Sequence, residues 1–260
     1  MMQQKLKYGI SAFAAFSVLA FLYFPLVIII WYSFNGEQTN SFPIHIYSLK
    51  WYNVLFQDDE MLGTVRASAI VALVATTAAL AIGLPAAYGM HKSDFRGKKM
   101  LQRIVLMPIT LPGIVTGVSM LSFFPLIGIN LSLTAVTFGH ITFLIAIIIT
   151  QMLARFQRLD PFLEQAAFDL GATPVKAFFR VIFPNIRTAI IGAILLCLVL
   201  SFDEIPVTFF LIARQNTLPI EIYSRMRRGI TPEVNAISTL IFIVTATAIL
   251  LSMRFNKQQD

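Results

Sequence analysis

The sequence predicts an all-α membrane protein with six transmembrane helices in a single domain, residues 1–260. Composition is the first reason. Hydrophobic residues make up 57% of the chain and charged residues only 13%, whereas a soluble domain usually carries about a quarter charged residues. Clustering is the second, because the apolar residues gather in charge-free blocks of about 20, the length that a helix needs to cross the hydrocarbon core.

The first four spans follow such blocks. The block Tyr8 to Gly36 is longer than a signal-peptide core and shows no small-residue cleavage site at its end, so we expect a retained helix. Ala67 to Met90 forms the second block. The uncharged run from Ile104 to Ala154 is too long for one crossing, and a turn signal between Pro125 and Ser132 divides it into two spans.

The last two spans complete the set. The fifth block, Thr188 to Ala213, is interrupted only by Asp203 and Glu204, and the sixth is Val234 to Met253. The predicted spans are residues 8–35, 67–90, 104–126, 131–154, 188–212 and 234–253.

Basic residues favour one orientation. With the N-terminus in the cytoplasm, fourteen lie inside: Lys5, Lys7, Lys92, Arg96, Lys98, Lys99, Arg103, Arg155, Arg158, Lys176, Arg180, Arg187, Arg254 and Lys257. Six lie outside: Lys50, Arg66, Arg214, Arg225, Arg227 and Arg228. This bias obeys the positive-inside rule and predicts that both termini are cytoplasmic. The net charge of +7 therefore indicates membrane topology rather than binding of nucleic acid.

Isolated polar and helix-loosening residues inside the spans carry weaker signals. Cys197 is the only cysteine, and we expect it to be a small buried residue. His140 in the fourth span is expected to be satisfied by a neighbouring helix rather than to bind a ligand. Pro112 and Gly113 loosen the third span and permit neighbouring helices to approach closely.

The longest loop between spans, residues 155–187, is predicted to begin with a short helix. Asp160 followed by Pro161 is a typical helix start, with an acid at the N-cap and proline at the first helical position. Apolar residues then recur at helical spacing as far as Gly171, which is a typical stop.

A second helix of this 155–187 loop is predicted to start at Thr173 and Pro174 and to end at Pro184. Each helix is expected to be about ten residues, or roughly 15 Å, long. Such a helical pair either only connects two spans or lays a small-residue helix into a groove on a partner protein.

The segment QAAFDLGATPVKAFFRVIFPN resembles the EAA motif of ABC-importer permeases, in which Glu-Ala-Ala is followed by a glycine and later by Ile-x-Leu-Pro. The residues in register are Ala166, Ala167, Gly171 and Pro184. One departure is that Gln165 occupies the position of the motif glutamate, with Glu164 directly before it. This departure puts a charge-pair role at that position in doubt.

The resemblance implies a type I ABC-importer permease of the bacterial inner membrane, whose coupling helix sits in a cleft of an ATPase subunit. The coupling residues that it implies are Glu164, Gln165, Ala166, Ala167, Asp169, Gly171, Ala172 and Pro184. The chain has no GxxxxGK[ST] phosphate loop, so we expect it to be no enzyme and to bind no cofactor or metal itself. ATP and magnesium would be held by the partner. The implied partners are a second permease, two ATPase subunits and an external solute-binding protein received chiefly by residues 217–233.

Asp203 and Glu204 provide the main clue to the solute. Ionisable residues inside a membrane are costly and indicate a functional site by default. Two adjacent carboxylates attract a cation and hold it beside aromatic rings. The alternative is that they lie at the outer interface or pair with external arginines. Acid–base catalysis is a poor third, because no nucleophile or metal-ligand cluster accompanies them.

Three further segments resemble the second permease subunit of spermidine/putrescine importers: Leu111–Leu121, Ser201–Phe210 and Leu218–Leu240. The resemblance implies a polyamine or related small organic cation as the solute. The expected path residues are Asp203, Glu204, Phe202, Phe209, Glu221 and Tyr223. A permease for another organic solute, an ion-gradient-driven transporter and a membrane scaffold remain as alternatives.

Overall fold

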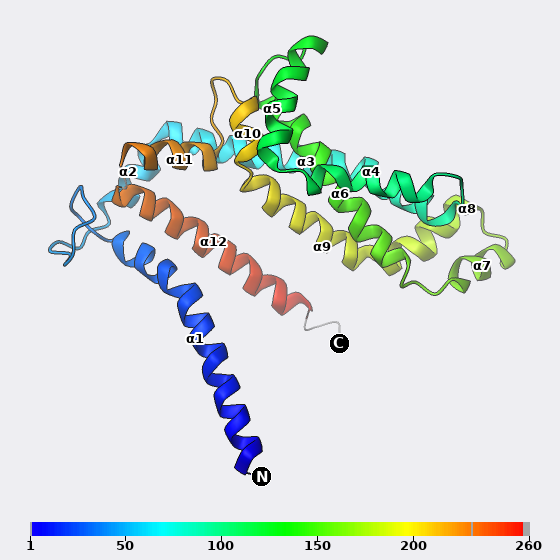
Figure 1. Ribbon diagram of the computed structural model, residues 1–260, viewed down its shortest axis with the longest axis horizontal. Helices are drawn as coiled ribbons and strands as arrows, with labels where there is room; N and C mark the ends of the chain where they lie inside the picture. Colours follow the sequence, from blue (N-terminus) through cyan, green and yellow to red (C-terminus); the bar gives the residue numbers. More distant parts are fainter. Residues whose placement is uncertain (1, 230, 257–260) are drawn as a thin grey trace. The chain divides into compact units, whose positions relative to one another are not determined.

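The computed structural model (Figure 1) describes residues 2–229 and 231–256, with side chains within 11–247 apart from 228 and 230. Two compact units are present. Gly63–Glu221 form one, and the described parts of 1–62 and 222–260 form the other. A single domain over 1–260 therefore stays a prediction. Lys257, counted above among the cytoplasmic cations, and the side chain of Arg228 lie outside the described residues.

Continuous helices coincide with most of the predicted spans. The spans at 8–35, 67–90 and 131–154 correspond to helices α1 (Met2–Tyr32), α3 (Asp59–Lys92) and α6 (Leu133–Phe156). All three are apolar and long enough to cross a membrane. The sixth corresponds to α12 (Pro232–Asn256), which packs against α1 and against the short helix α2 (Lys50–Gln57).

The third predicted span is a bent pair of helices. Helix α4 (Lys98–Thr110) and helix α5 (Gly113–Phe123) meet at 98°, and the 3₁₀ helix η1 (Phe124–Ile127) follows. Leu111 takes an extended conformation at the bend, with ψ of 139°. Proline disfavours the helical region for the residue before it, so Pro112 accounts for this geometry.

The fifth predicted span also breaks. Helix α9 (Phe183–Phe202) ends at the two acids, and helix α10 (Pro206–Leu211) follows after three residues. The predicted stop at Pro184 is wrong, because helix α8 (Pro174–Ala177), the π-helix η2 (Phe178–Ile182) and α9 form one continuous helix. Proline breaks an α-helix by removing a donor and crowding the carbonyl four residues back, and the wider π turn relieves that crowding.

Close packing of small residues builds the core of the 63–221 unit. Ala75, Ala79 and Ala87 on α3 are fully buried, and they join α6 and α9 in one apolar cluster that includes Cys197. Small residues let helix backbones approach, which is how helices associate without a hydrophobic drive in lipid. Within this unit, α7 (Phe162–Asp169) and α8 lie at one end and α5 and α10 at the other (Figure 1).

Candidate functional site

The 155–187 loop forms its two predicted helix starts. The Asp160 carboxylate accepts a hydrogen bond from the Phe162 backbone N–H at 2.9 Å, at the first residue of α7, although Pro161 and not Asp160 occupies the N-cap position. The Thr173 hydroxyl accepts from the Lys176 N–H at 3.4 Å and caps α8. Side-chain oxygens at these places satisfy N–H groups that the first turn leaves without partners.

A left-handed glycine ends α7. Gly171 has φ of +80°, and its N–H donates to the Phe168 carbonyl at 2.8 Å while the Ala172 N–H donates to the Ala167 carbonyl at 3.0 Å. These two hydrogen bonds define a Schellman turn. A Cβ at Gly171 would meet nothing within 4 Å, so the backbone conformation and not lack of space requires glycine here.

Helix α7 presents the motif residues on two different faces. Glu164 and Ala167 are buried, whereas Gln165, Ala166 and Asp169 are exposed. Successive helix residues are rotated by about 100°, so Glu164 does not restore a charge at the exposed position that Gln165 occupies. The residue that departs from the motif is therefore on the open face, and the glutamate before it faces inward.

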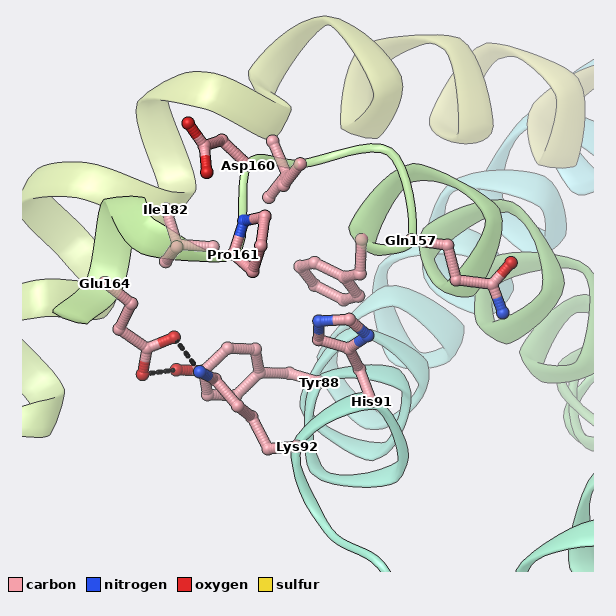
Figure 2. Close-up of a pocket in the computed structure, with 10 residues that line it drawn as sticks. Tyr88, His91, Lys92, Gln157, Asp160, Pro161, Glu164 and Ile182 are labelled. Carbon is pink, nitrogen blue, oxygen red and sulfur yellow. Dashed lines mark hydrogen bonds and ion pairs between the residues drawn. The ribbon is translucent and has the colours of Figure 1, made fainter.

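The buried Glu164 carboxylate is held by the last turn of α3. The Tyr88 hydroxyl donates to Glu164 Oε1 at 2.8 Å, and Lys92 Nζ forms an ion pair with Oε2. Figure 2 shows both side chains reaching the carboxylate from the same helix. Tyr88 and Lys92 were not among the predicted site residues. The available signal was their i, i+4 spacing at the end of an apolar span, which places them on one helix face.

Large apolar side chains are exposed on the 155–187 loop, beside exposed charged ones such as Arg158 and Lys176. Leu170 is 90% exposed and Phe162 is 69% exposed. The large exposed apolar residues of this loop are Phe162, Phe168, Leu170, Val175, Phe179 and Phe183. Isolated exposed apolar side chains are normal, whereas several together indicate an interaction surface, and Phe162, Phe168 and Leu170 all belong to α7 and its turn.

The two acids of the fifth span do different things. Glu204 Oε1 accepts a hydrogen bond from the Val207 N–H at 2.8 Å and so caps α10, while Asp203 is exposed. Neither acid forms an ion pair within the part of the chain that the structure describes. The predicted alternative partner Arg225 binds Asp58 at 2.8 Å and also pairs with Glu233.

Glycines on α5 permit close packing against the start of α10, which follows the two acids. A Cβ at Gly113 would lie 2.8 Å from Pro206 Cβ, and one at Gly117 would lie 2.7 Å from Phe210 Cδ2. Two segments that resemble one subfamily, Leu111–Leu121 and Ser201–Phe210, are thus packed together. The third span's bend and the fifth span's break form one packed structure.

The other predicted path residues are not all open. Glu221 is buried, and its carboxylate accepts a hydrogen bond from the Asn216 amide at 2.8 Å. Phe202 and Phe209 lie on either side of the break, and Phe209 is exposed. Tyr223 is also exposed and belongs to the other compact unit, so it is not described together with Asp203.

His140 joins three helices across the same break. Its Nδ1 is 2.7 Å from the Ser201 hydroxyl on α9, and its Nε2 is 2.8 Å from the Thr208 hydroxyl on α10. The ring is 1% exposed, which agrees with the prediction of a polar residue satisfied by its neighbours. A neutral imidazole serves both contacts, donating from one nitrogen and accepting at the other.

Replacing His140 with leucine is expected to lower the free energy of unfolding by about 1–2 kcal/mol, since interhelical hydrogen bonds in membranes contribute about 0.6 kcal/mol on average and at most about 1.7. Unfolding in mixed detergent micelles measures this change. Thr137→Val is the control, because the hydrogen bond that the structure gives the Thr137 hydroxyl stays within α6, to the Leu133 carbonyl. Equal stability of the two variants would contradict a bridging role for the histidine.

Comparison with known proteins places the chain among transport components. The family described as "Binding-protein-dependent transport system inner membrane component" matches residues 79–260. The putrescine transport system permease protein PotI of Escherichia coli K12 is 34% identical over 92% of this chain and 89% of its own length. The spermidine/putrescine transport system permease protein PotC of Haemophilus influenzae is 29% identical over 94% of this chain and 95% of its own.

Solved structures share the fold at low sequence identity. A bacterial ABC transporter that imports the acidic polysaccharide alginate matches with a TM-score of 0.72 at 13% identity, over 99% of this chain and 98% of that one. A second alginate ABC transporter structure, in complex with a pentasaccharide-bound periplasmic protein, also gives 0.72, at 17% identity over 96% and 92%.

Proposed function

Because this chain belongs to the family of binding-protein-dependent transport system inner membrane components, we propose that it forms part of the path for a polyamine or related small organic cation in an ATP-driven importer. The family consists of transport permeases and not of enzymes. Binding alone moves no solute uphill, so a partner has to bias two conformations of the permease. We propose that a separate ATPase, carrying ATP and magnesium, does so through the 155–187 loop.

The exposed apolar surface of that loop is the observation that carries the coupling proposal. Phe162 and Leu170 lie at the two ends of α7, with the small exposed Ala166 between them. A short helix with this composition suits insertion into a groove on a partner. The same apolar residues left exposed to water would favour aggregation.

The assembly follows from the same proposal. A second permease completes the path, two ATPase subunits bind on the cytoplasmic side, and an external solute-binding protein delivers the cation to residues 217–233. Both termini are then cytoplasmic, in accord with the distribution of basic residues. Helix α11 (Leu218–Arg228) gives that external segment an ordered surface.

The polyamine assignment rests on two supports. The relatives PotI and PotC are named as permeases for putrescine and for spermidine and putrescine. Asp203 is the exposed carboxylate at a helix break, and Phe202 and Phe209 stand nearby in sequence on either side. An anionic group beside aromatic faces attracts organic ammonium groups.

Asp203→Asn is expected to raise the KM for putrescine uptake about tenfold, since a lost charge contact of about 1.4 kcal/mol corresponds to a factor of ten. Glu204→Gln removes the negative charge but keeps the hydrogen bond, because the glutamine amide oxygen can still accept from the Val207 N–H. Glu60→Gln removes an exposed acid at the start of α3 and is the control, with KM unchanged. If Asp203→Asn leaves KM and maximal uptake at wild-type values, Asp203 does not line the path.

A further inference from the structure

The link between α7 and α3 depends on three polar side chains. Glu164 is 7% exposed, and it receives a hydrogen bond from Tyr88 and an ion pair from Lys92. Both donors come from the final turn of α3 and occupy one face of it. Both carboxylate oxygens of Glu164 on α7 are thus bound by side chains of α3.

Aromatic packing fixes the tyrosine. The Tyr88 ring lies 5.6 Å from the Phe156 ring at the end of α6 and 4.8 Å from the Phe178 ring in η2, centroid to centroid. The His91 ring stacks on the same Phe156 ring, with 5.5 Å between the ring centroids. The hydroxyl is therefore held in place by the helices that enter and leave the 155–187 loop.

A pocket adjoins this link. A cavity of about 180 Å³ lies between the end of α3 and the loop, lined by residues that include His91, Gln157, Asp160 and Ile182 (Figure 2). Tyr88, Lys92 and Glu164 themselves line this pocket.

We propose that Tyr88, Lys92 and Glu164 form the connection that passes movement of α7 to the membrane-spanning helix α3. The proposal rests on the proposed function, since it requires an ATPase to displace α7. Glu164 then acts inside the permease, while the exposed Gln165 face meets the partner. The three are positioning residues, and none of them is assigned a contact with the solute.

The test uses the complete importer, with its ATPase, second permease and binding protein, in proteoliposomes. The measured quantity is putrescine imported per ATP hydrolysed. Tyr88→Phe keeps the ring and removes only the hydroxyl, and Glu164→Gln removes the charge. Each is expected to lower this ratio about tenfold, within the usual range of coupling between sites, with the amount of bound ATPase unchanged. The ratio of the double variant is expected to be no lower than that of the single variant with the lower ratio, because both changes break the same link.

Asp94→Asn is the matched control. It removes the ion pair (3.0 Å) between Asp94, whose side chain is 99% exposed on the loop after α3, and Lys98 at the start of α4. Its ratio is expected to equal that of wild type. A merely structural role would lower assembly and leave the ratio intact, so an unchanged ratio in Tyr88→Phe overturns the proposal. If the wild-type chain binds no ATPase at all, the proposed function fails instead.

Discussion

A Gly171→Val protein is expected to retain ATP hydrolysis in its complex and to import at least about tenfold less putrescine per ATP than wild type. Gly171 has φ of +80°, a conformation that costs other residues roughly 1–2 kcal/mol and suits a β-branched residue least. Relief of this strain is expected to break the two turn hydrogen bonds and to change the angle between α7 and α8. Uptake and phosphate release, measured together in proteoliposomes, give the ratio.

Two variants control for this effect. Gly97→Val places the same strain at φ of +93° in another loop, with nothing within 4 Å of the new Cβ, and is expected to import normally. Gly171→Asn is expected to recover most of the ratio, because asparagine tolerates the left-handed conformation. Normal transport by Gly171→Val would remove the turn from the coupling mechanism.

Leu170→Asp is expected to weaken binding of the ATPase at least about 30-fold, the factor that corresponds to a hot-spot loss of 2 kcal/mol. Leu170 is 90% exposed in the isolated chain and has no structural role to lose there. An aspartate at the centre of an apolar contact would bury an unpaired charge. Titration of the detergent-solubilised permease with purified ATPase measures the affinity.

Leu126→Asp is the control for this prediction. Leu126 is 82% exposed in η1, at the predicted external end of the third span, and its replacement is expected to leave ATPase affinity at the wild-type value. Equal affinities for the two aspartate variants would mean that the apolar surface of the 155–187 loop is not the ATPase contact.

Hydropathy predicted the fold class because lipid imposes a simple rule. A chain in hydrocarbon has to satisfy its own backbone, so long charge-free blocks become helices. The spans at 67–90 and 131–154 therefore appear as α3 and α6 within a few residues. The all-α importer fold is confirmed by the family match and by the structural neighbours.

The breaks within spans were harder to predict, because both halves of each broken span are equally apolar. Pro112 indicated a loosened helix, but the sequence pattern gave neither the 98° bend nor the close approach of Gly113 to Pro206, nearly a hundred positions away. Pro184 was misread as a stop because a local rule ignores the π turn before it. Tertiary contact, not composition, decides such details.

The candidate coupling residues divide in the same way. The turn at Gly171 was predictable from a local preference for glycine at a helix end. The link of Glu164 to Tyr88 was not, because 76 residues separate them and neither residue has an unusual neighbourhood in the sequence. Motif register directed attention to Gln165, whereas the buried carboxylate next to it makes the contacts.

ATP-dependent uptake by the reconstituted importer is the most direct test of the central claim, that this chain is a polyamine permease driven by a partner ATPase. The permease pair, the ATPase and the binding protein are placed in proteoliposomes with labelled putrescine. Uptake is expected only when ATP and magnesium are supplied on the cytoplasmic side of the importer and the binding protein on its external side. Putrescine accumulation driven by an ion gradient, without ATP or the ATPase, would contradict the account.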